Sequence, residues 1–163
     1  MKTEVIEYNN FKSLIEKFGY SIPSGFAFIP LNFEIAPSRN DLVYSSEVKS
    51  VRKLLTQNKV GVDKIENEND RQFFLHQHNA AWLAPTIFIG VSLLSENPNA
   101  IAIALNVLSN YLTDFFKGGA QNSNFKMDII VEVEKGRLFK KITIEGEPKD
   151  FKELAKLIKE ITK

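Results

Sequence analysis

Two histidines stand two positions apart in the segment FFLHQHNAAW, and no other residues of this 163-residue chain suggest metal or acid–base chemistry as openly. On a strand, His76 and His78 would share one face and could supply two ligands to a metal ion. On a helix they would point about 200° apart, because 3.6 residues make one turn. The spacing of apolar residues favours a helix over 70–83, with Asp70 as a cap. The pattern therefore indicates that the two histidines hold no metal.

The remaining motifs give little support for catalysis. The chain has no cysteine, which excludes disulfides, thiolate metal sites and cysteine nucleophiles. It has no glycine-rich phosphate-binding motif, and the segment GVSLL around Ser92 lacks the second glycine of a nucleophile elbow. Glu132 and Glu134 alternate outward on an expected strand, which is typical of solvated carboxylates. We therefore expect a protein that is not an enzyme, with no catalytic residue, no cofactor and no metal.

Composition and charge narrow the class further. Hydrophobic residues make up 44% of the chain and charged residues 25%, as in ordinary globular proteins, and the length suits a single domain over residues 1–163. The 21 basic and 20 acidic residues give a net charge of +1, which argues against a nucleic-acid partner. The N-terminal segment MKTEVIEYNN has acidic residues where a secretory signal needs an apolar core. We expect a cytoplasmic protein.

Hydrophobic periodicity in the first part of the chain predicts two helices and a strand. A helix over residues 11–18 has Asn10 as its N-cap and Gly19 as its stop signal. The segment GFAFIPLNFEI alternates as a strand does, and Pro30 favours a position at a sheet edge or a bulge. A second helix is expected in SSEVKSVRKLLTQN, with Val48, Val51 and Leu55 facing inward.

The middle of the chain is its most apolar part. The segment AAWLAPTIFIGVSLL contains only Thr86 and Ser92 as polar residues, and it predicts an apolar helix that restarts at Pro85. A second helix follows from Pro98 to residue 116, so the two would form a central apolar helix pair. This pair fits the core of a domain. Alternatively, the helical hairpin over 80–116 inserts into a membrane, although fifteen residues fall below the roughly 18–20 needed to span a bilayer.

The C-terminal part predicts a ββα unit. After a polar linker over 118–124, the pair Lys135-Gly136 can close a two-residue hairpin, and Pro148 can open a final helix. The chain would then be a single α+β domain, with a possible subdivision into a helix-rich part over 1–117 and the ββα unit over 125–163. The hairpin register sets Val133 opposite Leu138, Ile129 opposite Ile142 and Met127 opposite Ile144.

Two apolar residues stand on the charged, outward face of this hairpin. In the predicted register Ile130 lies diagonal to Phe139, with acidic and basic residues around them. Apolar residues ringed by polar ones can anchor a protein partner, so Phe139 and Ile130 are candidate interface residues. The alternative is that both pack beneath the rest of the chain.

The order of elements over residues 80–163 resembles a known family. The hydrophobic helical pair ends in NYLTDFFKG, and the segment KMDIIVEVEKGRLFKKITIEGEPKDFKELAKLI closes the chain. This layout resembles the small effector-associated adaptor domains, of the constant-component type, found in bacterial conflict systems beside peptidase, TIR or nucleotide-sensing partners. The resemblance implies a non-enzymatic adaptor and transfers no catalytic residue to this chain.

Three functions follow as hypotheses. The first is a non-enzymatic protein-interaction or adaptor module of a bacterial defence system, with a protein partner or a homo-oligomer as its assembly, because so much apolar helix surface favours a partner. The second is a membrane-active protein that inserts the 80–116 hairpin. The third is a small-molecule-binding domain whose pocket is lined by some of the 13 phenylalanines.

Overall fold

The structure is a computed structural model that describes residues 1–75, 84–116 and 125–162. At its centre is a six-stranded mixed sheet with the strand order β1-β6-β5-β4-β2-β3, which confirms the α+β class. The strands are β1 (Lys2–Glu7), β2 (Phe26–Ile29), β3 (Val62–Asp63), β4 (Thr86–Ile89), β5 (Phe125–Glu134) and β6 (Leu138–Gly146).

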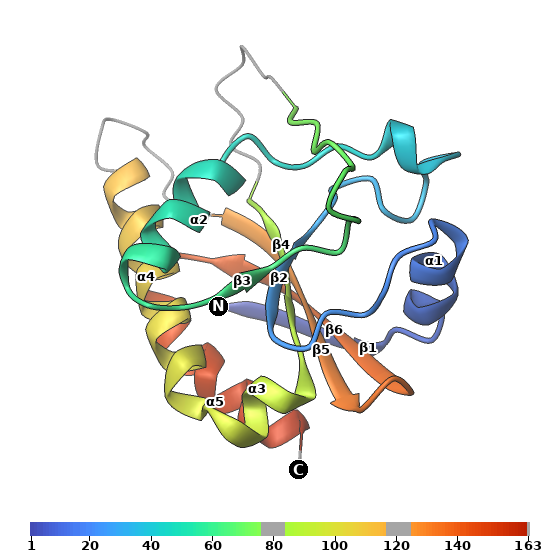
Figure 1. Ribbon diagram of the computed structural model, residues 1–163. Coiled ribbons are helices and arrows are strands. Elements are labelled where there is room, and N and C mark those ends of the chain that lie inside the picture. Colours follow the sequence, from blue (N-terminus) through green and yellow to red (C-terminus); the bar gives the residue numbers. More distant parts are fainter. Residues whose placement is uncertain (76–83, 117–124, 163) are drawn as a thin grey trace.

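Helices lie on both sides of this sheet. Figure 1 shows α2, α3, α4 and α5 gathered on one side, while α1 lies on the other. Among the described residues, no helix combines the length and the apolar character needed to cross a membrane. The helices are α1 (Phe11–Lys17), α2 (Val48–Gln57), α3 (Val91–Glu96), α4 (Pro98–Phe116) and α5 (Phe151–Ile161), with short 3-10 turns at Arg39–Asp41 and Pro148–Asp150.

Side chains that alternate along the strands form two apolar cores. On one face, Ile129 and Ile144 pack beneath α2, α4 and α5, which bury residues such as Leu55 and Leu108 against them. This face is called the closed face below. On the other face, Phe11 of α1 is fully buried, and it contacts the rings of the residues Phe33, Phe88 and Phe139 at centroid distances of 5.8, 5.4 and 5.0 Å.

Residues 86–89 depart most from the sequence prediction. They form β4, which pairs parallel with β5 and antiparallel with β2, so the predicted central helix pair and the 80–116 helical hairpin are wrong over this stretch. A short apolar run fits a strand buried on both faces as well as it fits a buried helix. Ile87, Phe88 and Ile89 are indeed fully buried. Gly90 ends the strand where any larger side chain would overlap the backbone of Ser24. Only the second predicted helix, α4, forms as expected.

In the first part of the chain both predicted helices form, and the predicted strand is shorter than expected. Helices α1 and α2 form where their periodicity predicts them, and Val48, Val51 and Leu55 of α2 are fully buried. Strand β2, in contrast, stops at Ile29 and lies inside the sheet between β4 and β3. Pro30 therefore ends this strand, and the prediction of an edge strand that continues to residue 35 is wrong.

The C-terminal hairpin confirms most of its predicted register. Ile129 pairs with Ile142 and Met127 with Ile144, but Leu138 pairs with Glu134 instead of Val133. The turn has three residues rather than two, because Gly136 adopts a φ of +68° and leaves a bulge in β5. The sheet also crosses the predicted subdivision, since β5 pairs with β4 and β6 with β1, whereas the predicted linker lies outside the described residues.

The predicted helix over 70–83 is wrong where the structure describes it. Residues 70–75 are irregular, and Phe74 forms a β-bridge with Tyr44. The backbone of Tyr44 donates to Phe73 and accepts from Leu75, at 2.8 Å each. The backbone groups of Phe73 and Leu75 therefore form hydrogen bonds with a neighbouring segment instead of within a helix. The spacing of apolar residues in one segment does not reveal such a partner.

Candidate functional site

The most exposed regular element of the described chain is β1, at one edge of the sheet. All six of its residues are exposed, including the apolar side chains of Val5 (38%) and Ile6 (42%), which point to opposite faces. In the part of the chain that the structure describes, β6 is its one strand neighbour, with Val5 opposite Ile142 and Ile6 opposite Lys141. A whole edge of backbone groups is therefore open to a further strand.

The direction of those backbone groups follows from one hydrogen bond. The N–H of Tyr8 donates to the carbonyl of Phe139, its register partner, at 2.9 Å. In an antiparallel ladder, every second residue of a strand forms backbone hydrogen bonds with a given neighbour. The backbone N–H and C=O groups of the even-numbered residues of β1 therefore point toward β6. The N–H and C=O groups of Thr3, Val5 and Glu7 consequently point away from the sheet.

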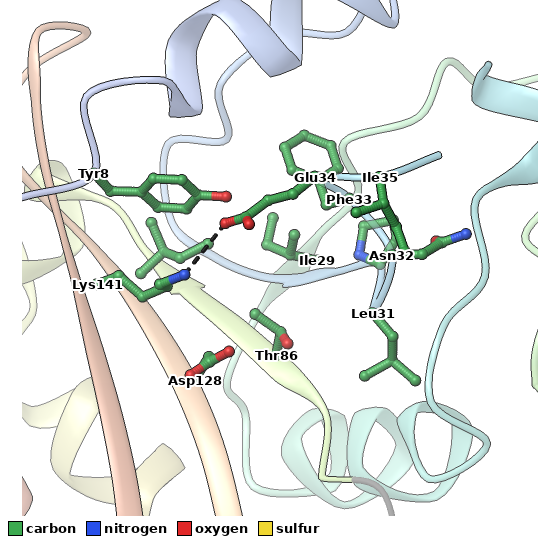
Figure 2. Close-up of a pocket in the computed structure, with 12 residues that line it drawn as sticks. Tyr8, Ile29, Leu31, Asn32, Phe33, Glu34, Ile35, Thr86, Asp128 and Lys141 are labelled. Atoms are coloured by element: carbon green, nitrogen blue, oxygen red, sulfur yellow. Dashed lines mark hydrogen bonds and ion pairs between the residues drawn. The ribbon is translucent and has the colours of Figure 1, made fainter. Parts of the chain in front are cut away.

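On the face of the sheet that carries α1 lies a cavity of about 170 Å³, called the polar hollow below. Figure 2 shows charged and hydroxyl groups converging on it from β4, β5, β6 and the segment after β2. It is lined by Tyr8, Ile29, Pro30, Leu31, Asn32, Phe33, Glu34, Ile35, Thr86, Asp128, Ile130 and Lys141.

One wall of the polar hollow is formed by the turn that follows Pro30. Asn32 fixes this turn, since its side chain accepts from the N–H of Val43 at 2.9 Å and donates to the carbonyl of Asp41 at 2.8 Å. The turn carries Glu34 over β6, where its carboxylate lies 3.2 Å from the Lys141 ammonium. Asn32, a residue type that favours turns, thus helps to bring Glu34 to Lys141, which lies 107 residues further along the sequence.

Tyr8 completes this group of charged and polar side chains. Its hydroxyl donates to the Glu34 carboxylate, and the Lys141 ammonium lies 4.8 Å from the centre of its ring. The hydrogen bond from Tyr8 and the contact with Lys141 lower the pKa of Glu34 despite partial burial. Burial and the nearby Glu34 carboxylate raise the pKa of Tyr8. The two shifts favour an ionised Glu34 carboxylate and a neutral Tyr8 hydroxyl.

The opposite wall of the polar hollow is less fully paired. Asp128 is half-buried, and one of its carboxylate oxygens accepts from the Thr143 hydroxyl at 2.7 Å. Within the described residues Asp128 has no ion pair, because Lys141 is engaged by Glu34. Figure 2 shows Asp128 and Thr86 close to each other on this wall. The arrangement presents one carboxylate and one hydroxyl to the space of the polar hollow.

The structure places the predicted interface residues in the interior. Ile130 and Phe139 are each 2% exposed and belong to the core around Phe11. They therefore fit the alternative that both pack beneath the rest of the chain. The sequence showed the correct face of the hairpin for both residues, but it did not show that α1 folds back over that face.

Glu132 is also placed differently from its expectation as a solvated carboxylate. It is 4% exposed, and its two oxygens accept the N–H of Val91 at 3.0 Å and the N–H of Gly136 at 2.9 Å. It joins the start of α3 to the turn of the hairpin, so its role is structural. Glu134, in contrast, stays on the surface and pairs with Arg137 at 3.2 Å.

The two histidines, His76 and His78, lie outside the described residues, so their predicted lack of a metal role stays a prediction. Within residues 1–75, 84–116 and 125–162, no three His, Cys, Asp or Glu side chains are grouped so that they could hold a metal ion. Sequence reasoning missed both β1 and the polar hollow. Only β1 left a signal, in the β-branched residues of the segment KTEVIE.

Comparison of the chain with models of known protein families, with curated proteins and with solved structures finds no match.

Proposed function

We propose that this protein is a non-enzymatic protein-interaction module that binds its partner along the open edge of β1. The observation that carries the proposal is the exposure of β1 over its whole length, with three residues directing backbone groups outward. An extended segment that adds to such an edge gains main-chain hydrogen bonds, and its alternate side chains provide specificity. Val5 and Ile6 would supply apolar contact on the two faces of the extended sheet.

The wider setting of this module rests on the resemblance to effector-associated adaptor domains. In that setting the protein acts as an adaptor in a bacterial defence system and works beside an effector or sensor protein encoded next to this chain.

Amide hydrogen exchange tests the proposal residue by residue. In the monomer, at low protein concentration, the outward amides of Thr3, Val5 and Glu7 should exchange fast, and those of Glu4 and Ile6 should be protected by β6. Binding of a protein partner at this edge should protect the outward three selectively. If a partner binds while these three amides still exchange fast, β1 is not the binding edge.

A matched pair of variants supplies the control for partner binding. Val5→Lys places a charge on the open edge, where lysine discourages strand addition. Ile103→Lys makes the same change at a residue of similar exposure, 43%, on α4. Partner binding should be lost in Val5→Lys and retained in Ile103→Lys.

Binding of a small molecule is a second candidate function, and the polar hollow favours it. The phenylalanine-lined pocket expected from the sequence takes a different form here, because Phe33 is the one phenylalanine among the lining residues of this hollow. The unpaired carboxylate of Asp128 instead favours a small cation such as a primary amine. Titration with simple amines, monitored by the amide shifts of Thr86 and Asp128, should saturate in the native protein and not in Asp128→Asn.

A further inference from the structure

We infer that the partner strand on β1 is the β1 strand of a second copy of this chain, paired antiparallel about a two-fold axis at Val5. The inference rests on the proposed function of the β1 edge and names its partner. A dimer of identical chains has a two-fold axis, so the same edge of both copies forms the interface. The two β1 strands then lie side by side and run in opposite directions.

Backbone chemistry limits how two β1 strands can align. The outward N–H and C=O groups belong to Thr3, Val5 and Glu7, so each of these must face one of the same three residues in the second copy. An alignment that is shifted by one residue from such a pairing places a residue whose backbone groups point outward opposite one whose backbone groups point toward β6. Such an alignment forms no ladder of hydrogen bonds.

The alignment centred on Val5 is the one that pairs all three outward residues. It sets Val5 opposite Val5 and Thr3 opposite Glu7 at both ends, so each of these residues both donates and accepts. An alignment centred on Glu4 leaves Glu7 opposite Met1, and an alignment centred on Ile6 leaves Thr3 beyond the partner strand. Hydrogen bonding therefore favours the axis at Val5.

Side chains favour the same alignment. With the axis at Val5, two half-exposed valines meet on the face shared with Ile142, and Glu4 lies opposite Ile6 on the other face. No like charges stand directly opposite each other. The alignment centred on Glu4, in contrast, sets the carboxylates of the two Glu4 residues against each other, which is destabilising.

Disulfide cross-linking through a single introduced cysteine tests this alignment, because the chain has no cysteine of its own. In Val5→Cys the two new thiols would lie on directly opposed residues, about 5.5 Å apart between Cα atoms, which is within the range for a disulfide. In Ile6→Cys the exposed fraction of the original side chain is similar, but the two thiols would lie on residues offset along the strands. Mild oxidation should therefore cross-link Val5→Cys efficiently and Ile6→Cys poorly.

The molecular mass of the protein in solution tests the dimer without a cross-linking reaction. The native protein should approach twice 18.5 kDa as its concentration rises in sedimentation experiments. Val5→Lys should weaken this association roughly tenfold or more, because it replaces an apolar pair by two facing ammonium groups, while Ile103→Lys should associate as the native chain does.

Two results would overturn the inference. The first is a native protein that stays at 18.5 kDa at every concentration, and the second is Ile6→Cys cross-linking as well as or better than Val5→Cys. Failure here is distinguishable from failure of the proposed function. If the protein is monomeric and a different protein still protects the outward amides of β1, the edge binds another partner and the proposed function stands.

Discussion

The two faces of the sheet are built from the same strands and differ in how they are covered. On the closed face, three helices bury Ile129 and Ile144 almost completely. On the other face, α1 and the segment after β2 cover only part of the sheet, and Asp128 and Lys141 of the same two strands remain partly exposed around the polar hollow. Together with the edge at β1, this second face holds the surface that we propose for binding. The difference shows that coverage by distant segments, and not strand sequence alone, decides which side chains are buried and which stay exposed here.

The largest expected effect tests whether the part of the second face beneath α1 is as much a core as the closed face. Phe139→Ser should lower the free energy of unfolding by about 3 kcal/mol or more, because the ring is buried against Phe11 and a hydroxyl replaces it. Urea denaturation measures this change, with Ile129→Ala as the closed-face control at about 3 kcal/mol. A loss below about 1 kcal/mol for Phe139→Ser would mean that α1 does not pack there.

A smaller effect is expected at Glu132, the buried carboxylate between α3 and the hairpin. Glu132→Ala removes two hydrogen bonds to a charged acceptor and leaves the N–H groups of Val91 and Gly136 without this acceptor. We expect a loss of roughly 2–3 kcal/mol by urea denaturation, and a smaller loss of about 1 kcal/mol for the isosteric Glu132→Gln. Equal losses in the two variants would contradict this expectation, because they would show that the shape kept by glutamine contributes little and that both carboxylate oxygens are needed.

Glu34 at the polar hollow should affect stability less, and in a pH-dependent way. Its pKa is lowered in the folded protein, so the stabilisation is present above the ordinary pKa of a glutamate and disappears as pH falls through the lowered value. Its side chain is 48% exposed, so Glu34→Gln should lose no more than about 1 kcal/mol at neutral pH. Thermal melting from neutral to acidic pH should show the native protein and Glu34→Gln converging in acid. Curves that stay parallel would contradict the ion pair with Lys141.

The smallest effect on stability is expected at the open edge. Val5→Lys should change the free energy of unfolding of the monomer by less than about 0.5 kcal/mol, because Val5 is exposed at an edge strand. Melting at low protein concentration measures this. A large loss would place Val5 among the stabilising residues and remove the contrast between the edge and the covered faces.

Sequence patterns predicted the elements whose periodicity is unambiguous. Alternation in the hairpin set most of the register of β5 and β6, and helical spacing gave α1, α2, α4 and α5. The apolar run at β4 was misread, because a strand buried on both faces has no alternation to show. Gly136 was correctly placed in the turn, but its positive φ lengthened that turn by one residue.

The candidate sites were less predictable, since each depends on residues that are distant in sequence. Glu34 and Lys141 meet only because Pro30 ends β2 and the following turn lies over β6. The local sequence around Phe139 does not indicate that α1 covers this residue. Sequence reasoning missed β1 although its segment carries β-branched residues, and its place at the edge depends on pairing with β6 alone among the described strands.

The sequence by itself determined the class of fold, the hairpin and the amphipathic helices, because these depend on periodicities that span only a few residues. The tertiary structure alone decided which apolar residues are core, that Glu132 is buried, and that β1 is an open edge. These outcomes depend on which distant segments cover a given face, and a face is defined by its neighbours rather than by its own residues. The same alternation of side chains is therefore compatible with a core, a hollow or a docking edge until the chain has folded.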